Sequence, residues 1–261
     1  MYFKSFLLFL FLCVFTFGQE EAKAKKDAKT IKVMSYNIHY GIGMDKKKDL
    51  ARIAKVILKE KPDIVGLQEI SNLAMAKELG KLTGMKFVFG PSLGSNKRYG
   101  DAILSKYPFK VLPNHSIPSA SSSRYQALGI DVDLSTLYGK EKTVRFITTH
   151  FDWLRTLGSH FSRMASVDLI EKAFMDKNKL STILTGDFNA KPDSEPIKKL
   201  IQKGWITSKG SYNTHPAPKP TKQIDYVMIR KNTGLKVLKT KVMKEPVASD
   251  HLPVVMMIEL K

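Results

Sequence analysis

The sequence predicts one mixed α/β domain whose β-sheets are covered by helices on their outer faces. Short apolar runs of strand length recur along the chain, and segments with apolar residues at helical spacing separate them in both halves. No internal repeat, domain linker or heptad run interrupts this pattern. About 240 residues are enough for one large domain that buries most of its apolar surface without disulfide bonds.

The first half of the domain is expected to begin strand, helix, strand. Pro62 and Asp63 end the first helical segment, in which apolar residues are spaced by three and four. The expected elements are a strand from Ile31 to Tyr36, a helix through Leu50, Ile53, Ala54, Ile57 and Leu58, a buried strand from Ile64 to Leu67, a helix from Asn72 to Leu82, and short strands at Phe87 to Phe89 and Ala102 to Leu104.

The middle of the chain, from Tyr107 to Leu134, has an all-β pattern in which prolines punctuate alternating apolar and polar residues. The loop expected from Gly210 to Thr221 holds three prolines. The remaining expected elements are a strand from Val144 to Thr149, a helix from Ser159 to Phe174, a strand from Ser181 to Gly186, and strands at Ile224 to Ile229, Val237 to Val242 and Val254 to Ile258.

Residues 1–18 have the pattern of a cleaved secretory signal peptide. Lys4 precedes an apolar block from Phe6 to Phe17, and Gly18 stands before Gln19. The block is shorter than the roughly 20 residues of a membrane-spanning helix. A lipoprotein anchored through Cys13 is the alternative, but Leu12 is bulky where lipidation sites carry a small residue. We therefore expect a secreted or periplasmic protein with a disordered leader at 19–30 and a catalytic domain at 31–261.

The composition favours polyanionic partners only slightly. The formal net charge is +19, but most of the excess is lysine scattered along the chain, which is typical of a solvated surface. Cys13 is the only cysteine, so cleavage of the signal would leave none, and the stability of the domain must come from its core.

Two polar clusters stand directly against apolar, strand-like runs. Gly186-Asp187-Phe188-Asn189 follows one run, and Ser249-Asp250-His251-Leu252-Pro253 precedes another. Ligands bind at strand ends in α/β sheets, and residues two apart in an extended chain face the same way. One of Asp187 and Asn189 can therefore activate water while the other holds an oxyanion.

Further polar residues have the same placement beside apolar runs. They are Asn37, Glu69, His150, Asp225 and the pair Asp250-His251. Each of them alone has a structural explanation, because an Asp or Asn at a strand end commonly caps a turn and a histidine can be a satisfied, half-buried side chain. Their order along the chain is the informative feature.

In that order, the sequence resembles the endonuclease/exonuclease/phosphatase family, the deoxyribonuclease I-like, metal-dependent phosphohydrolases. The resemblance covers nearly the whole chain after the signal. Its motifs are Ser35-Tyr36-Asn37, Leu67-Gln68-Glu69, Tyr99-Gly100-Asp101-Ala102-Ile103-Leu104-Ser105, Thr149-His150-Phe151-Asp152, Gly186-Asp187-Phe188-Asn189, Ile224-Asp225-Tyr226 and Ser249-Asp250-His251-Leu252-Pro253. It implies a four-layer sandwich of two packed, mixed β-sheets flanked by helices, which agrees with the α/β pattern above.

The resemblance also implies a metal site. Glu69 would be the principal ligand, assisted by Asn37 and Asp250. Oxygen donors suit Mg²⁺ or Mn²⁺, and no thiolate is available for a softer metal. His39, two places after Asn37, stands where some relatives carry an acid that helps to hold metal, which leaves the choice between one metal and two open.

The catalytic groups follow by the same resemblance. Asp187 would position or deprotonate the attacking water, Asn189 would hydrogen-bond the phosphate, and Asp225 would hold and support a histidine, His251 being the expected one. His150 and His251 would contact the phosphoryl oxygens as donors. The histidines that match no motif are expected on the surface or in loops: His115, His160 and His215.

Three further residues are expected in supporting roles. Asp152, two residues after His150, can orient that histidine or cap the next turn, and we favour the first. Arg124 and Arg163 fall where relatives often place arginines, and either can pair with a carboxylate of the site or form a structural salt bridge.

The expected activity is that of a secreted, Mg²⁺-dependent phosphodiesterase or phosphomonoesterase. A nuclease acting on DNA or RNA is an alternative, with Lys97-Arg98-Tyr99 and Trp153-Leu154-Arg155 as candidate groove residues. A phospholipid hydrolase would need an exposed apolar hairpin or loop, and no aromatic-rich insertion of that sort is apparent. Neither a protein partner nor stable membrane insertion is expected after signal cleavage.

The runs Asn37 to Asp45 and Lys219 to Tyr226 look most like those of secreted bacterial hydrolases of unassigned substrate. A catalytically inactive, basic module that binds polyanions is the alternative from another class. The chain retains every catalytic residue type, and this argues against such a module.

Overall fold

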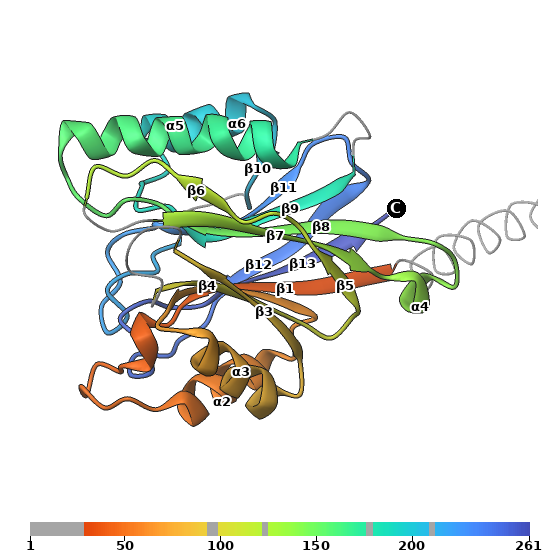
Figure 1. The fold of residues 1–261 in the computed structure, drawn as a ribbon, viewed down its shortest axis with the longest axis horizontal. Helices are drawn as coiled ribbons and strands as arrows, with labels where there is room; N and C mark the ends of the chain where they lie inside the picture. The colour runs from red at the N-terminus through yellow and green to blue at the C-terminus, as the bar shows by residue number, and fades with distance from the viewer. Residues whose placement is uncertain (1–28, 93–98, 122–124, 176–179, 209–211) are drawn as a thin grey trace, which may run out of the picture.

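Two β-sheets pack face to face, and helices cover the outer face of each (Figure 1). The computed structural model describes residues 29–92, 99–121, 125–175, 180–208 and 212–261. The predicted signal peptide, Cys13 and residues 19–28 of the predicted leader lie outside these described ranges. The four layers confirm the predicted sandwich of two mixed sheets flanked by helices.

The first sheet has six strands in the order β12-β13-β1-β2-β4-β3. Only β1 and β2 are parallel; the other neighbours are antiparallel. Its strands are β1 (Lys29–Asn37), β2 (Ile64–Ile70), β3 (Lys86–Pro91), β4 (Gly100–Ser105), β12 (Leu235–Val242) and β13 (Val254–Leu260).

The second sheet has seven strands in the order β10-β11-β9-β8-β7-β5, with β6 also paired to β7. Here β8 and β9 are the parallel pair. Its strands are β5 (Phe109–Val111), β6 (His115–Ile117), β7 (Tyr125–Asp133), β8 (Thr143–His150), β9 (Ser181–Asp187), β10 (Trp205–Ile206) and β11 (Asp225–Arg230).

The helices begin at capping side chains. Asp49 accepts from the backbone N–H of Arg52 at the start of α2 (Leu50–Glu60), and Asn72 accepts from Met75 at the start of α3 (Leu73–Thr83). These two helices cover the first sheet, while α5 (Leu157–Phe174) and α6 (Glu195–Gln202) cover the second (Figure 1). A short α4 (Ser135–Tyr138) and a 3₁₀ turn, η1 (His39–Gly41), lie in connections.

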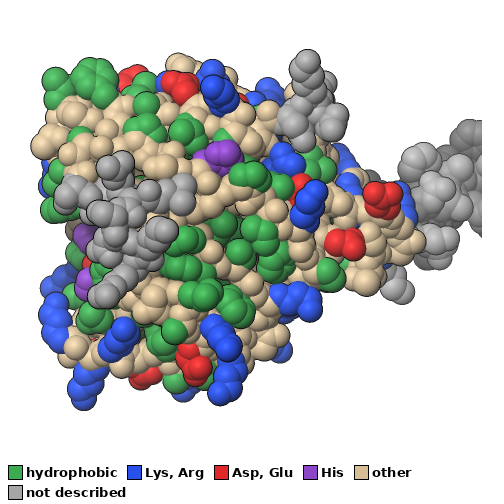
Figure 2. All heavy atoms as spheres, viewed as in Figure 1, with side chains coloured by type: hydrophobic (Ala, Val, Ile, Leu, Met, Phe, Trp, Pro, Cys, Tyr) green, Lys and Arg blue, Asp and Glu red, His purple; other side chains and the backbone are tan. Residues whose placement is uncertain are grey.

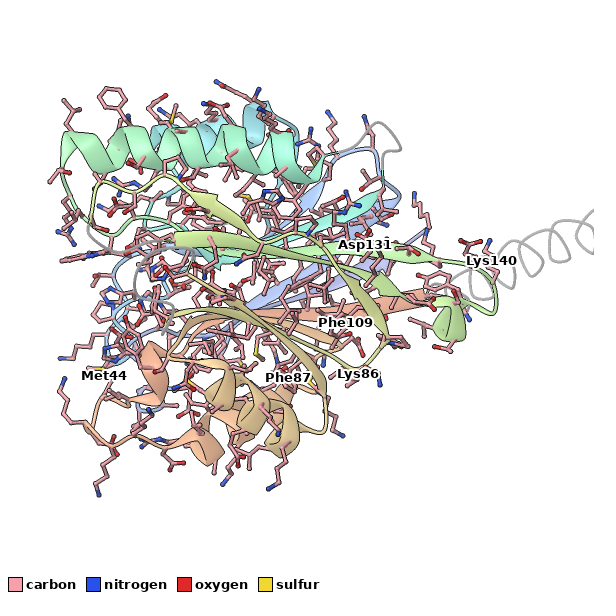
Figure 3. All side chains as sticks on the ribbon, in the orientation of Figure 1. Met44, Lys86, Phe87, Phe109, Asp131 and Lys140 are labelled. Carbon is pink, nitrogen blue, oxygen red and sulfur yellow. The ribbon has the colours of Figure 1, made fainter. Side chains whose placement is uncertain are left out.

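Three apolar layers form the core, and strand periodicity divides the side chains among them. In β1, Met34 and Tyr36 pack under α2 and α3, whereas Ile31 and Val33 pack between the sheets. Phe87 packs against the outer of these two layers and Phe109 against the inner one (Figure 3). A third layer lies between the second sheet and the helices α5 and α6 and includes Ile170, Leu200 and Trp205.

The structure differs from the predicted elements in several places, and the short elements η1, α4 and β10 were not predicted. β1 begins at Lys29, so the predicted leader overlaps it by two exposed residues that pair with β13 and carry no apolar signal. β2 continues through Glu69, which was expected to follow the strand, to Ile70. Helix α6 was not predicted, although Pro196 at its start and the spacing of Ile197, Leu200 and Ile201 are typical of a helix.

The polar residues singled out in the sequence lie at one end of the sandwich. Asn37, His150 and Asp187 end β1, β8 and β9, and Asp225 begins the antiparallel β11. Met44, in the loop after η1, lies at this end and Lys140 at the opposite end (Figure 3). None of the described helices is long and apolar enough to cross a membrane.

Candidate active site

A pocket of about 1330 Å³ opens where the strands of both sheets end. Strand pairing brings its central residues together: His150 on β8 and Asp225 on β11 are each in register with Asp187 on β9. From the first sheet come Asn37 on β1 and Glu69 on β2. The site is therefore assembled between the two sheets, and each sheet supplies part of it.

Asn37 connects the two sheets at the floor of the pocket. Its amide Nδ2 donates to Glu69 Oε1 at 3.0 Å and to Asp187 Oδ2 at 3.1 Å. Its side-chain oxygen accepts from the backbone N–H of His39 at 3.0 Å. One buried amide thus fixes the spacing between the predicted metal ligand and the predicted water-activating acid.

Glu69 occupies an irregular position in its strand. Its φ is 61°, in the left-handed region, and the pairing of β2 with β4 shifts register between Leu67 and Ile70. A β-bulge of this kind re-aims a side chain. The bulge explains how a residue inside a strand reaches the pocket at the strand end.

His251 is held by two carboxylates. Its Nδ1 lies 2.9 Å from Asp225 Oδ2, and its Nε2 lies 3.6 Å from Asp187 Oδ2. Burial opposes the charge on this imidazole, but Asp225 and Asp187 outweigh burial and raise the pKa of His251 to about 10. The ring is therefore protonated at neutral pH, and the predicted contact between Asp225 and His251 is present.

His150 is in the opposite electrostatic state. Burial lowers its pKa, against the charge of Asp187, whose Oδ2 lies 3.5 Å from His150 Nε2. Its Nδ1 lies 2.8 Å from the hydroxyl of Tyr99, and its Nε2 lies 3.1 Å from the amide Nδ2 of Asn189. A neutral ring that accepts from Asn189 at Nε2 carries its proton at Nδ1, facing Tyr99.

Within the described residues, the carboxylates at the centre of the pocket form no ion pair with a lysine or an arginine. Burial raises the pKa of Glu69, and burial together with the charge of Asp225 raises the pKa of Asp187. Within the described part of the chain, the ion pairs of Asp187 and Asp225 are with histidines, and Glu69 has none. A cation among these groups would offset their mutual repulsion.

The donor set fits a hard divalent cation. Glu69 and Asp250 offer carboxylate oxygens, and the oxygen of Asn37 keeps a lone pair beside its bond from His39. Ser249 donates to the backbone carbonyl of Asn37 at 2.8 Å and so ties the loop of Asp250 to β1. His39 Nδ1 lies 3.8 Å from Asp250 Oδ1, beside this donor set.

Asp152 does not orient His150, contrary to our expectation. It is fully buried, and its carboxylate accepts from the backbone N–H groups of Ala120, Ser121 and Leu154. These bonds outweigh its burial and lower its pKa. Asp152 therefore fastens two loops together and caps the turn after His150, which is the alternative that we did not favour.

Arg163 lines the pocket but does not pair with a carboxylate there. Its guanidinium donates to the backbone carbonyls of Asp152, at 2.7 Å, and Leu154, at 3.0 Å. Its position on α5 lets it hold the loop that leads into the helix. Arg124 lies outside the described residues.

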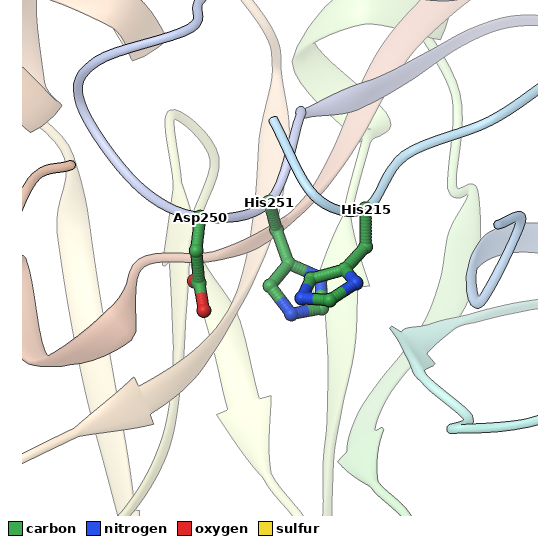
Figure 4. Close-up of side chains that lie close together, drawn as sticks. All are labelled: His215, Asp250 and His251. Carbon is green, nitrogen blue, oxygen red and sulfur yellow. The ribbon is translucent and has the colours of Figure 1, made fainter. Parts of the chain in front are cut away.

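His215 lies in a loop, as expected, and that loop also places it in the pocket, which no motif indicated. Its ring centroid lies 4.6 Å from that of His251, and ligand atoms of His215, Asp250 and His251 lie within 4.8 Å of one another (Figure 4). Backbone bonds from Ala217 to Asp250 and from Leu252 to Thr214 hold the two loops side by side. No local pattern in the sequence indicates this contact.

Two more residues near the centre were given no catalytic role by the sequence: Tyr99 was named in a motif and as a candidate groove residue beside Lys97 and Arg98, which lie outside the described residues, and Asp101 was named in a motif. Tyr99 contacts His150, as described above. Asp101, on β4, is fully buried, and burial together with the charges of Glu69 and Asp187 raises its pKa well above the usual range. The wall of the pocket also includes Tyr40, Trp153, Arg155, Lys191 and Lys222.

The arrangement is suited to hydrolysis of an anionic ester. It combines hard oxygen donors for a cation, a buried carboxylate beside them, a protonated imidazole opposite, and lysine and arginine on the wall. Such a pocket can stabilise negative charge that develops on an ester oxygen.

Comparison with family models identifies the fold and the chemistry together. The model of the Endonuclease/Exonuclease/phosphatase family matches residues 34–251. This range includes every candidate catalytic and metal-binding residue described above. A comparison with curated protein sequences gave no match.

Solved structures of the same family have the same fold. A protein from Bacteroides vulgatus superposes with a TM-score of 0.73 at 17% identity, over 89% of this chain and 99% of that chain. A mannosyl-6-phosphatase from Bacteroides thetaiotaomicron gives 0.67 at 18% identity, over 87% and 99%. The human Nocturnin catalytic domain with bound sulfate gives 0.66 at 21% identity, over 89% and 94%.

Proposed function

The chain belongs to the endonuclease/exonuclease/phosphatase family and is a hydrolase of phosphoester bonds, and we propose that it is an exported, Mg²⁺-dependent phosphodiesterase or phosphomonoesterase. The observation that carries this proposal is the position of Asp187. Its Oδ2 lies between the amide of Asn37, at 3.1 Å, and Nε2 of His251, at 3.6 Å. A water held by this oxygen would stand between the metal ligands and a protonated imidazole.

Glu69, Asn37 and Asp250 would hold the cation. Mg²⁺ fits oxygen donors that leave several positions open for water and substrate, and Mn²⁺ accepts the same set. When bound, it would offset charge that develops on a phosphoryl oxygen. The raised pKa of Glu69 supports this assignment, because a partly buried carboxylate that forms no ion pair among the described residues favours a nearby cation.

Asp187 would orient the attacking water and accept its proton. A carboxylate with a raised pKa is a better base than an ordinary aspartate, since its pKa lies closer to the working pH. The backbone N–H of Asn189 donates to Asp187 Oδ1 at 2.9 Å, so the water would bind Oδ2, which also accepts from the amide of Asn37. The proton that Asp187 accepts is then adjacent to both histidines.

His251 would donate a hydrogen bond to the phosphoryl group as its charge develops. Asp225 fixes the ring through Nδ1 and supports its positive charge, so Nε2 is the donor that remains. The neutral His150 would hold Asn189 in place, and Asn189 would bind the phosphate after exchanging its bond with His150 for one to the substrate.

We propose that residues 1–18 direct export and are then removed. The apolar block ends at Phe17, and the small residue Gly18 precedes Gln19. N-terminal sequencing of the protein recovered outside the cytoplasm should begin at Gln19. An N-terminus at Cys13 would support the lipoprotein alternative instead.

A nuclease is the second candidate, because an exposed aromatic side chain and basic residues share the pocket wall. Trp153 and Arg155 lie on one loop, and Lys191 and Lys222 on two others. Aromatic and basic groups of this kind stack bases and bind phosphates. A mannosyl-6-phosphatase is among the similar structures, so sugar phosphates belong in the substrate test beside nucleic acids.

The test is hydrolysis by the purified protein of bis-p-nitrophenyl phosphate, p-nitrophenyl phosphate, mannose 6-phosphate, plasmid DNA and RNA, with Mg²⁺ or with EDTA. Glu69→Ala and Asp187→Ala should each lose about 100-fold or more in rate. Glu195→Ala is the matched control, since Glu195 is an exposed residue of α6 paired only with Lys198.

The outcomes separate the proposal from its alternatives. Activity that needs Mg²⁺ and is lost in both variants, but kept in Glu195→Ala, would support the proposed site, and the best substrate would distinguish a nuclease from a phosphatase. Equal activity in all variants would contradict the site. Binding of DNA without hydrolysis of any substrate would favour the inactive polyanion-binding module.

A further inference from the structure

Large apolar side chains are exposed in a short segment beside the mouth of the pocket. Trp153 is 59% exposed, Leu157 71% and Phe161 61%, within nine consecutive residues. Leu157 and Phe161 are four residues apart on α5 and therefore share one face of the helix. Exposed single apolar residues are common, but a group of three at one site indicates an interaction surface.

This group lies at the entrance to the site. Trp153 itself lines the pocket, and α5 begins four residues later. Hydrophobic side chains are gathered on the surface over the beginning of α5, at the upper left of the space-filling view (Figure 2). A partner bound to this group would therefore cover or face the pocket.

Basic residues accompany the group along the chain, and the acids of the adjoining pocket, Glu69, Asp187 and Asp250, belong to the proposed active site. Between Trp153 and Val167 the sequence has Arg155 and Arg163 and no acidic residue. Lys191 and Lys222 line the same pocket, and the chain as a whole has a net charge of +19. An apolar group set among basic residues matches an anionic lipid surface, where acyl chains lie beneath phosphate groups.

We propose that Trp153, Leu157 and Phe161 form a docking surface that enters the interface of membranes containing anionic phospholipid, with the mouth of the pocket turned toward the headgroups. Docking of this kind is peripheral, since it buries side chains of one loop and one helix turn without a membrane-spanning helix. It goes beyond the proposed hydrolysis and does not depend on it.

Tryptophan fluorescence of the full chain tests the proposal directly. The chain has two tryptophans, and Trp205 is only 1% exposed and bonded to Glu171, so Trp153 is the one that can report a change of solvent. Vesicles of phosphatidylcholine with phosphatidylserine should shift the emission to shorter wavelength, and vesicles of phosphatidylcholine alone should shift it much less. The protein should also float with the mixed vesicles.

Leu157→Ser/Phe161→Ser should weaken vesicle binding by about tenfold or more, because it removes two apolar side chains that would enter the membrane interface. Both residues are exposed, so the fold should be retained, which thermal melting would check. Leu73→Ser is the matched control: Leu73 is 58% exposed on α3, in the opposite outer layer, and its substitution should leave vesicle binding unchanged.

Three results would overturn the proposal. The first is vesicle binding without a shift of the tryptophan emission. The second is vesicle binding that survives the double substitution, which is expected if the apolar block at Phe6 to Phe17 binds the membrane instead. The third is absence of vesicle binding; in that case, dimerisation that the double variant abolishes would assign the surface to a second copy of the chain. Each assay is independent of hydrolysis, so failure here would leave the proposed enzymatic function standing.

Discussion

At the scale of single residues, the site converges on one carboxylate oxygen. Asp187 Oδ2 lies 3.1 Å from Asn37 Nδ2, 3.5 Å from His150 Nε2 and 3.6 Å from His251 Nε2. The two histidines beside it have pKa values shifted in opposite directions, because His251 also contacts Asp225 and His150 does not. One imidazole is thus prepared as a cationic donor and the other as a neutral structural partner.

Asp225→Asn should move the alkaline limb of the pH–rate profile to lower pH. The carboxylate of Asp225 helps to raise the pKa of His251 to about 10. Activity that needs the charged imidazole is present below this pKa and lost as pH rises through it, and removal of the carboxylate lowers the pKa. The measurement is kcat/KM from pH 6 to pH 10 beside Asp168→Asn, an exposed acid on α5. An unshifted limb would contradict the role of Asp225.

Tyr99→Phe should reduce kcat by about three- to tenfold. The substitution removes the hydrogen bond between the Tyr99 hydroxyl and Nδ1 of His150 but keeps the aromatic ring of residue 99. Steady-state kinetics on the best substrate would measure this. Tyr138→Phe is the control, because the Tyr138 hydroxyl bonds to the backbone of Lys29 at 3.2 Å, away from the pocket. Equal rates in the two variants would mean that Tyr99 does not position His150.

At the scale of elements, the close approach of the two sheets positions the site. Gly66, in the middle of β2, faces the second sheet: a Cβ atom there would clash with Thr185 Oγ1 and lie 2.7 Å from Thr148 Oγ1. Gln68, two residues later, donates to Thr148 Oγ1 at 2.8 Å. The strand that carries Glu69 is therefore held against β8 and β9 by small residues and one buried bond.

Gly66→Ala should lower the free energy of unfolding by about 1–3 kcal/mol, because an added methyl group must push the sheets apart. Denaturation in urea, followed by circular dichroism, measures this. Activity should fall as well, since Glu69 and Asp187 lie on the two strands that would separate. An unchanged unfolding midpoint would show that the two sheets accommodate the added methyl group without a loss of stability.

At the scale of the whole molecule, two carboxylates of the site make stability depend on pH. Glu69 and Asp187 have raised pKa values, so each contributes more stability below its unfolded pKa and loses that contribution as pH rises through its folded pKa. A bound cation would offset this loss at neutral pH. The stability of the molecule and its activity are thus coupled through the same carboxylates.

Mg²⁺ should raise the melting temperature of the wild-type chain at pH 8 by about 2 °C or more, because it binds the folded state selectively. Glu69→Gln should melt no lower than the wild type without metal and should not respond to Mg²⁺. Differential scanning fluorimetry over a Mg²⁺ series measures both, with Glu195→Gln as a control that responds normally. An equal response of Glu69→Gln would place the cation elsewhere.

Much of the fold and of the centre of the site could be predicted from local patterns. Residues such as Asn37, His150 and Asp187 stand where apolar runs end, and strand ends that share one edge of a sheet bring them together. The missed or misplaced elements are short or polar: Lys29 and Thr30 carry no apolar signal, and the helical pattern of α6 spans only eight residues. These elements depend on what they pack against.

The sequence by itself determined a mixed α/β domain through its apolar periodicity and the family through the order of its motifs, and the resemblance to that family implied the four-layer sandwich and the candidate site residues. Only the tertiary structure decided which loops approach one another. It placed His215 beside His251, turned Asp152 and Arg163 to backbone groups, and exposed Trp153 at the pocket mouth. Such contacts arise between segments far apart in the chain, and no local preference of either segment specifies them.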